Sequence, residues 1–105
     1  NVALTTEADK PGSDVKLWEE FNKYFWEDVI GRWFSGLCIV LMGEVAHKSA
    51  AYIDPKLHYL WQVQHPAGAA RNDSKWGAEK CWKEMDKVLW ENNKAVIRWV
   101  CDLPF

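Results

Sequence analysis

Two polar side chains fall among apolar residues where they could take part in chemistry. His65 closes an alternating segment on the same side as Tyr59 and Trp61, and histidine exchanges protons near neutral pH. Asn22 falls in the apolar sector of a helix, where a buried amide must be hydrogen-bonded. We treat both as candidate catalytic residues. The simpler interpretations are a surface histidine beside a proline and an amide bonded to a strand carbonyl.

Aromatic residues are the second unusual feature of the sequence. Eight of the 105 residues are tryptophan, whereas ordinary usage is about one per cent. Each buries a large surface and carries an N–H that needs a partner. The simpler interpretation is an aromatic core, and the alternative is a flat pocket or a subunit interface. For a pocket, we expect a wall of Trp18, Tyr59, Trp61 and Trp82, with Arg71 available to hold an anion.

Histidine and cysteine patterns indicate no metal site and no cofactor. His47 and His58 form no histidine pair at metal-ligand spacing with a carboxylate. Cys38, Cys81 and Cys101 form no CxxC pair, and their odd number leaves at least one unpaired. We therefore expect reduced, structural thiols, which are typical of a cytoplasmic protein.

Charge and length narrow the possible partners. The net charge of −2 leaves no basic surplus, and neutralising phosphates supplies most of the affinity for nucleic acid, so we expect no nucleic acid partner. The longest apolar run, Leu37 to Met42, is far too short to cross a bilayer, so we expect no membrane partner. Residues 1–105 are predicted to form a single domain.

The first half of the chain contains patterns for a strand, a helix and a second strand. Val2 to Thr6 is β-prone and precedes a Pro-Gly turn signal. A helix is predicted from Asp14 to Ile30, with Ser13 as N-cap and Gly31 closing it. The segment from Ser35 to Val45 contains the apolar run, which is typical of a strand covered on both faces.

The second half of the chain also contains patterns for both strands and a helix. Ala50 to Ile53 fits either a strand extension or a loop, and Asp54 to Lys56 a turn. Leu57 to His65 alternates as a strand does. A loop is expected from Pro66 to Asp73, followed by a helix that Asp73 or Ser74 caps and Asn92-Asn93 stops. The last segment, Ala95 to Leu103, alternates again and is predicted to be a strand.

This order of elements predicts an α+β fold of the ferredoxin-like βαββαβ type. Such a fold has a four-stranded antiparallel sheet with two helices on one face. Because the Leu37 to Met42 run is apolar on both sides, we expect two copies of the chain to pack sheet against sheet as a homodimer. RNA-recognition domains share the order, but they need a glycine-flanked third strand on a basic sheet, and Leu57 to Gln64 contains no glycine.

Several short motifs resemble the dimeric α+β barrel superfamily, and in particular its antibiotic-biosynthesis-monooxygenase-like members. They are Lys10-Pro11-Gly12, Trp18-Glu19-Glu20-Phe21, Gly36-Leu37, and Asp54-Pro55 followed by Leu57-His58-Tyr59-Leu60-Trp61. The resemblance implies a homodimer with a pocket between sheet and helices, and oxygenation of phenolic or quinol-type substrates without a cofactor. Haem-degrading members carry a histidine on the second helix, and Trp76 to Glu91 has none.

Two hypotheses for the function follow. The first is a small cofactor-independent monooxygenase-like enzyme that acts on an aromatic or polyketide-type substrate in a tryptophan-lined pocket, with His65 taking a proton from the substrate. The alternative is a non-catalytic protein that binds a small hydrophobic ligand in the same cavity. Both expect a small aromatic or hydrophobic molecule as partner.

Overall fold

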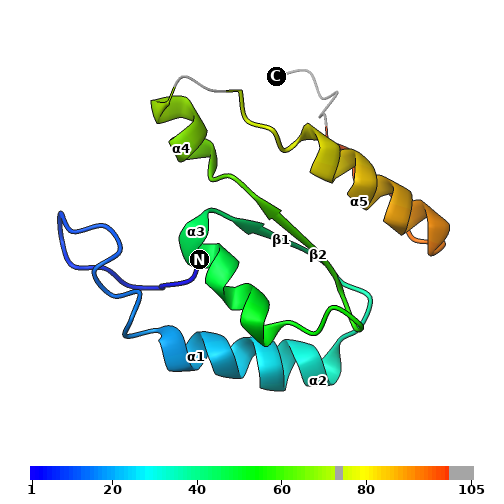
Figure 1. Ribbon diagram of the computed structural model, residues 1–105. Helices are drawn as coiled ribbons and strands as arrows, with labels where there is room; N and C mark the ends of the chain where they lie inside the picture. Colours follow the sequence, from blue (N-terminus) through cyan, green and yellow to red (C-terminus); the bar gives the residue numbers. More distant parts are fainter. Residues whose placement is uncertain (73–74, 100–105) are drawn as a thin grey trace, which may run out of the picture.

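The sheet at the centre of the molecule has two parallel strands (Figure 1). The computed structural model describes residues 1–72 and 75–99. Strand β1 runs over Cys38–Met42 and strand β2 over Tyr59–Val63. They pair in parallel, with Cys38 opposite Tyr59 and Met42 opposite Val63. The strands predicted within 35–45 and 57–65 are thus confirmed, although each is shorter than predicted.

The predicted ferredoxin-like architecture is wrong. The sheet of the described residues is two-stranded and parallel, not four-stranded and antiparallel. Residues 2–6 form no strand, and neither do residues 94–99; the rest of the predicted last strand lies outside the described residues. The β-prone run at residues 2–6 and the alternation of the last segment reflect β propensity alone, and packing readily overrides such a propensity. Since a four-stranded sheet with a bare face was the reason to expect a homodimer, that expectation loses its basis.

A helical crossover joins the two strands and explains their parallel pairing. Helix α3, Glu44–His47, is followed by the 3-10 helix η2, Lys48–Tyr52. Parallel neighbours need a connection of about a dozen residues or more, and it is usually helical. The strand extension considered for Ala50 to Ile53 is therefore wrong, and Ile53 instead packs into the core.

One continuous helical segment precedes β1. It comprises α1, Glu19–Tyr24, the π-helix η1, Phe25–Ile30, and α2, Gly31–Trp33. It begins later than predicted, because residues 11–18 form turns. It also continues through Gly31, whose φ of −67° is an ordinary helical value, and ends at Phe34, where the backbone becomes extended.

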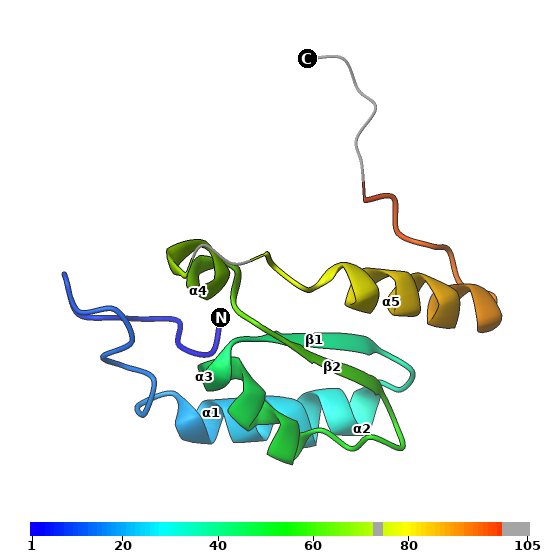
Figure 2. The ribbon, with the colours of Figure 1, turned by 45° about the horizontal axis from the view of Figure 1, so that its top comes forward.

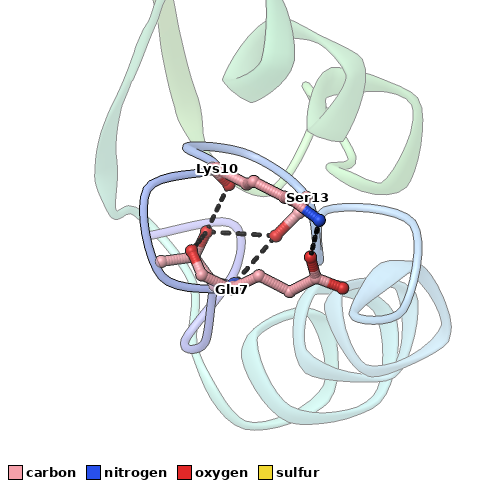
Figure 3. A network of polar contacts seen from close by, with 4 residues as sticks. Glu7, Lys10 and Ser13 are labelled. Carbon is pink, nitrogen blue, oxygen red and sulfur yellow. Dashed lines mark hydrogen bonds and ion pairs between the residues drawn. The ribbon is translucent and has the colours of Figure 1, made fainter.

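The turns before α1 are held by polar contacts within the loop (Figure 3). The Thr6 hydroxyl donates to the carbonyl oxygen of Lys10 at 2.7 Å, and the Ser13 hydroxyl oxygen accepts from the Glu7 N–H at 2.9 Å. The Lys10 ammonium lies 2.8 Å from the Glu7 carboxylate. Ser13 therefore closes this loop instead of capping a helix that starts at Asp14.

The sheet lies between two helical layers, which Figure 2 shows from the side. The segment α1 to α2 runs along one face, and helix α5, Glu79–Glu91, along the other. Ile39, Leu41 and Ile53 form the buried core on the first side, with Trp26 and Leu60 packed against them. Burying such side chains is the main source of stability in a domain of this size.

Helix α5 confirms the second predicted helix, although it begins only at Glu79. Its buried residues are Cys81 and Met85. The Trp61 indole N–H donates to the Glu84 carboxylate at 3.0 Å, and the Lys94 ammonium donates to the Gly36 carbonyl oxygen at 3.2 Å. The proposed caps Asp73 and Ser74 lie outside the described residues.

The predicted loop after β2 is wrong in part, because Pro66–Arg71 forms helix α4. Pro66 occupies the first helical position, where its missing N–H is not needed. The ring of His65 caps the helix by accepting the N–H of Ala67 at 3.1 Å. In the part of the chain that the structure describes, no helix is both long and apolar enough to cross a membrane.

Candidate functional site: a cleft at the carboxyl ends of the strands

A cleft of about 750 Å³ opens where both strands end. Because β1 and β2 are parallel, their carboxyl ends meet at one edge of the sheet. Gly43 and His47 line the cleft from the β1 side, and Gln64, His65 and Arg71 from the β2 and α4 side. In α/β proteins, ligands commonly bind outside the carboxyl ends of the strands, and pockets of about 300–1,000 Å³ are typical of small-molecule sites.

The orientation of the His65 ring follows from its hydrogen bond. Its Nδ1 accepts the backbone N–H of Ala67 and so carries no proton. In the neutral ring the proton therefore resides on Nε2. The residue is exposed on the wall of the cleft, so this N–H can donate to a bound molecule.

Gly43 permits a close approach between β1 and His65. Its φ of 87° and ψ of 165° lie in a region that side chains rarely allow. A Cβ atom at this position would stand 2.9 Å from the Cβ of His65. The Gly43 N–H also donates to the Val63 carbonyl oxygen at 2.9 Å. The backbone of the first strand thus fixes the place of the histidine that follows the second.

His47 ties the crossover helix to the end of β2. Its Nε2 lies 2.9 Å from the Val63 carbonyl oxygen. A carbonyl oxygen only accepts, so Nε2 is the donor and holds the proton in this contact. His47 and Gly43 are site residues that the sequence analysis did not select.

The structure places Asn22 away from this cleft. Its side chain is 8% exposed, and its amide donates to the carbonyl oxygens of Val2 and Trp18, the latter at 2.9 Å. The amide is thus bonded to backbone carbonyls, as the simpler interpretation requires, although not to those of a strand.

The aromatic residues chosen as a pocket wall are divided among separate contacts. Trp18 donates its indole N–H to the Thr5 hydroxyl at 2.8 Å. The Tyr59 hydroxyl accepts a hydrogen bond from the Asn92 amide, which follows α5, and the Trp61 indole N–H donates to Glu84 within α5. Trp82 packs edge-on against Trp76. Of the seven proposed site residues, the structure brings His65 and Arg71 together at the cleft.

The two described cysteines are free. Burial raises the pKa of the Cys38 thiol, and burial together with the nearby Glu84 raises the pKa of the Cys81 thiol. A thiol with a raised pKa is a poor nucleophile at neutral pH. Within residues 1–72 and 75–99, no three histidine, cysteine or acidic residues are grouped as metal ligands.

A parallel strand pair, a helical crossover and a cleft at the carboxyl edge define an α/β protein with a cleft at the ends of its strands. Solved structures show the same fold. The chain superposes on the mimivirus UNG Y322F, crystallised in complex with UGI, with a TM-score of 0.78 and 23% identity, covering 94% of this chain and 42% of that one.

Sequence comparison points the same way. The chain is 35% identical to the uracil-DNA glycosylase of Buchnera aphidicola over 101 residues, which are 94% of this chain and 44% of the relative. It is 29% identical to the uracil-DNA glycosylase of Sodalis glossinidius over 105 residues, 99% of this chain and 45% of the relative. The chain thus spans less than half the length of the curated relatives it matches. No family model matches it.

These relatives overturn several of the expectations from sequence. The resemblance to the dimeric α+β barrel superfamily is wrong, and so are the monooxygenase-like and hydrophobic-ligand-binding functions. The exclusion of nucleic acid is wrong as well, because the relatives are by name enzymes that act on DNA. Net charge is a sum over the whole chain, so it does not describe the charge at any one part of the surface.

Proposed function

We propose that this chain takes part in uracil-DNA glycosylase activity and that the cleft at the ends of β1 and β2 receives the uracil base. The observation that carries the proposal is the 35% identity to the Buchnera enzyme along 94% of this chain. The cleft supports it, because a glycosylase turns its target base out of the stack into a pocket and binds it there by hydrogen bonds.

His65 is the residue of this chain that we assign to the chemistry. When the bond between uracil and deoxyribose breaks, its electron pair leaves with the base, and negative charge develops on the uracil carbonyl oxygens. A donor already aimed at that position stabilises the transition state. The Nε2–H of His65 is such a donor, because Nδ1 is occupied by the Ala67 N–H. His65 thus acts as a hydrogen-bond donor, whereas the sequence alone suggested a base.

Arg71 lies at the same cleft and is exposed. Arginine commonly binds DNA phosphates, and such contacts position the strand without reading its sequence. We assign Arg71 this role, in which it binds an anion, as the sequence suggested.

With free thiols at Cys38 and Cys81, we also propose a cytoplasmic location, which cell fractionation with an antibody to the chain would test.

A chimeric enzyme tests the function. This chain replaces the matched 101 residues of the Buchnera uracil-DNA glycosylase, and excision is measured on a labelled single-stranded oligonucleotide that contains one uracil. We expect the chimera to release uracil. His65→Asn should lower the rate about 100-fold or more, while asparagine keeps the helix capped because it is a preferred N-cap residue.

Lys83→Ala serves as the matched control, because Lys83 is exposed on α5 and does not line the cleft. Circular dichroism establishes that each chimera is folded. A folded chimera that leaves uracil in place contradicts the function. An active chimera in which His65→Asn and Lys83→Ala behave alike contradicts the role of His65.

A further inference from the structure

Three tryptophans form a row that begins beside the candidate cleft. The Trp76 indole N–H donates to the Gln64 carbonyl oxygen at 2.8 Å, and Gln64 lines the cleft. The Trp76 and Trp82 rings meet edge-on, with their centres 5.8 Å apart. The Trp82 and Trp99 rings follow, with their centres 5.0 Å apart and their planes at 40°. This tryptophan row, Trp76, Trp82 and Trp99, thus extends from the wall of the cleft to α5.

The far end of the row lies on the outer side of α5. After this helix the backbone turns back along it, on the side away from the sheet (Figure 2). The Trp99 indole N–H donates to the Asp86 carboxylate at 2.9 Å, which fixes the ring on the helix. Even so, 48% of the Trp99 surface is exposed. Nearly half of a large aromatic side chain is thus held in one place and in contact with solvent.

The burial of the row differs from that of a core cluster. Trp76 and Trp82 are half-buried and Trp99 is exposed, whereas the residues that α5 buries are Cys81 and Met85. Hydrogen bonds hold the Trp76 and Trp99 rings in place. Rings that are already fixed lose little freedom when a flat molecule stacks on them. The row therefore has the properties of a stacking surface.

Charge in the sequence is divided between two parts of the chain. Residues 1–70 hold six Lys and Arg residues and nine Asp and Glu residues, whereas residues 71–99 hold seven and five. The part with the positive surplus contains both Arg71 and the tryptophan row. Lys75 pairs with Glu79 at 3.7 Å, but both side chains are largely exposed, and such pairs contribute little. A phosphate group can therefore replace the carboxylate beside Lys75.

We propose that the tryptophan row binds single-stranded DNA next to the nucleotide that the cleft holds. A strand with one base in the cleft must place its neighbouring nucleotides at the mouth of the cleft. Their bases stack on Trp99 and on the exposed part of Trp82, and Arg71 and Lys75 bind their phosphates. Every base has an aromatic face, so this contact reads no sequence. The assignment rests on the proposed function, because it takes DNA as the substrate, but binding needs no excision of uracil.

A DNA strand without uracil tests this surface apart from catalysis. The probe is a fluorescein-labelled oligothymidylate of about 12 nucleotides, a length that one stacking surface can span. Fluorescence anisotropy measures its Kd for the 105-residue chain at one fixed, low salt concentration. We expect saturable binding. The same strand paired into a duplex should bind at least about 10-fold more weakly, since its bases must first be unpaired before they can stack.

Substitutions at Trp99 separate stacking from charge. Trp99→Ala should raise the Kd about 5-fold to 150-fold, the usual effect of removing one stacked aromatic side chain. Trp99→Phe keeps an aromatic face and should restore most of the binding. Trp33→Ala is the matched control, because Trp33 is 74% exposed but lies on α2, in the helical layer on the other side of the sheet. It should leave the Kd unchanged, and circular dichroism establishes that each variant is folded.

A measurement on the unsubstituted chain gives an answer even if Trp99→Ala unfolds. Each tryptophan contributes one indole N–H signal to the NMR spectrum, and a base stacked on the ring shifts that signal. On addition of the oligothymidylate, we expect the signals of Trp82 and Trp99 to shift and the signal of Trp33 to stay in place.

Four results would overturn the proposal. They are no saturable binding of the strand, full binding by a folded Trp99→Ala variant, indole shifts that leave out Trp82 and Trp99, and a dimer in light scattering that Trp99→Ala abolishes. In the last case a second copy of the chain occupies the row. Strand binding by the row without uracil release by the chimeric enzyme leaves this surface standing and contradicts the proposed function alone. Uracil release without strand binding by the row does the reverse.

Discussion

Replacing Gly43 with alanine tests how the first strand positions the candidate catalytic histidine. The glycine adopts φ 87° and ψ 165°, a conformation that costs other residues about 1–3 kcal/mol. The added methyl group would stand 2.9 Å from the His65 Cβ, and overpacking of this kind typically costs about 1–3 kcal/mol more. We therefore expect Gly43→Ala to lower the free energy of unfolding by at least about 2 kcal/mol.

Urea unfolding followed by tryptophan fluorescence measures this effect. Gly77→Ala is the matched control, because a Cβ there meets nothing within 4 Å and Gly77 is not among the glycines with positive φ. It should change stability by no more than about 0.5–1 kcal/mol. In the chimeric enzyme, a displaced His65 should lower uracil excision about 100-fold, since shifts of about 1 Å in a reacting group have that effect. Equal unfolding midpoints for the two alanine variants would refute the reasoning.

Three further substitutions test other contacts. Asn22→Leu removes the bond to the Val2 carbonyl oxygen and should lower stability by about 1–3 kcal/mol, with faster proteolysis of the N-terminal residues; unchanged proteolysis would count against it. Trp61→Phe removes the bond to Glu84 and should cost about 0.5–1.5 kcal/mol in urea unfolding. Burial raises the pKa of the Cys81 thiol above its ordinary 9.0, so the folded state holds that proton more tightly; the resulting stabilisation is full below about pH 9 and is lost as the pH rises further. Thermal melts at pH 7 and 10 should therefore differ less for Cys81→Ala than for the parent chain.

Local patterns predicted several elements well. The apolar run of β1, the alternation of β2 and the helical spacing of α5 are properties of contiguous residues, and the structure confirms all three. Helix α4 was missed because its N-cap is His65, which is not among the residues that usually mark a helix start. The parallel pairing was missed because it depends on the helical crossover, for which Ala50 to Ile53 carried a weak signal.

Some residues of the candidate site could likewise be selected from the sequence, whereas others could be recognised only in the structure. His65 and Arg71 were selected from the sequence because each carries its own chemistry, and both line the cleft. Gly43 and His47 gain their roles from the parallel alignment that brings the end of β1 beside the end of β2. A glycine directly after a buried strand was the available signal, but it acquires meaning only once the partner strand and its direction are known.

The π-helix η1 has a consequence for how homologous chains can differ in length. A π-helical turn bonds each N–H to a carbonyl five residues back, so it stores one residue more than an α-helical turn would. Homologues that lack this surplus residue can keep the flanking helical faces in register with a chain one residue shorter. Single-residue gaps in an alignment should therefore gather at Phe25–Ile30, and a deletion elsewhere in this helix would instead rotate every side chain that precedes it relative to the sheet.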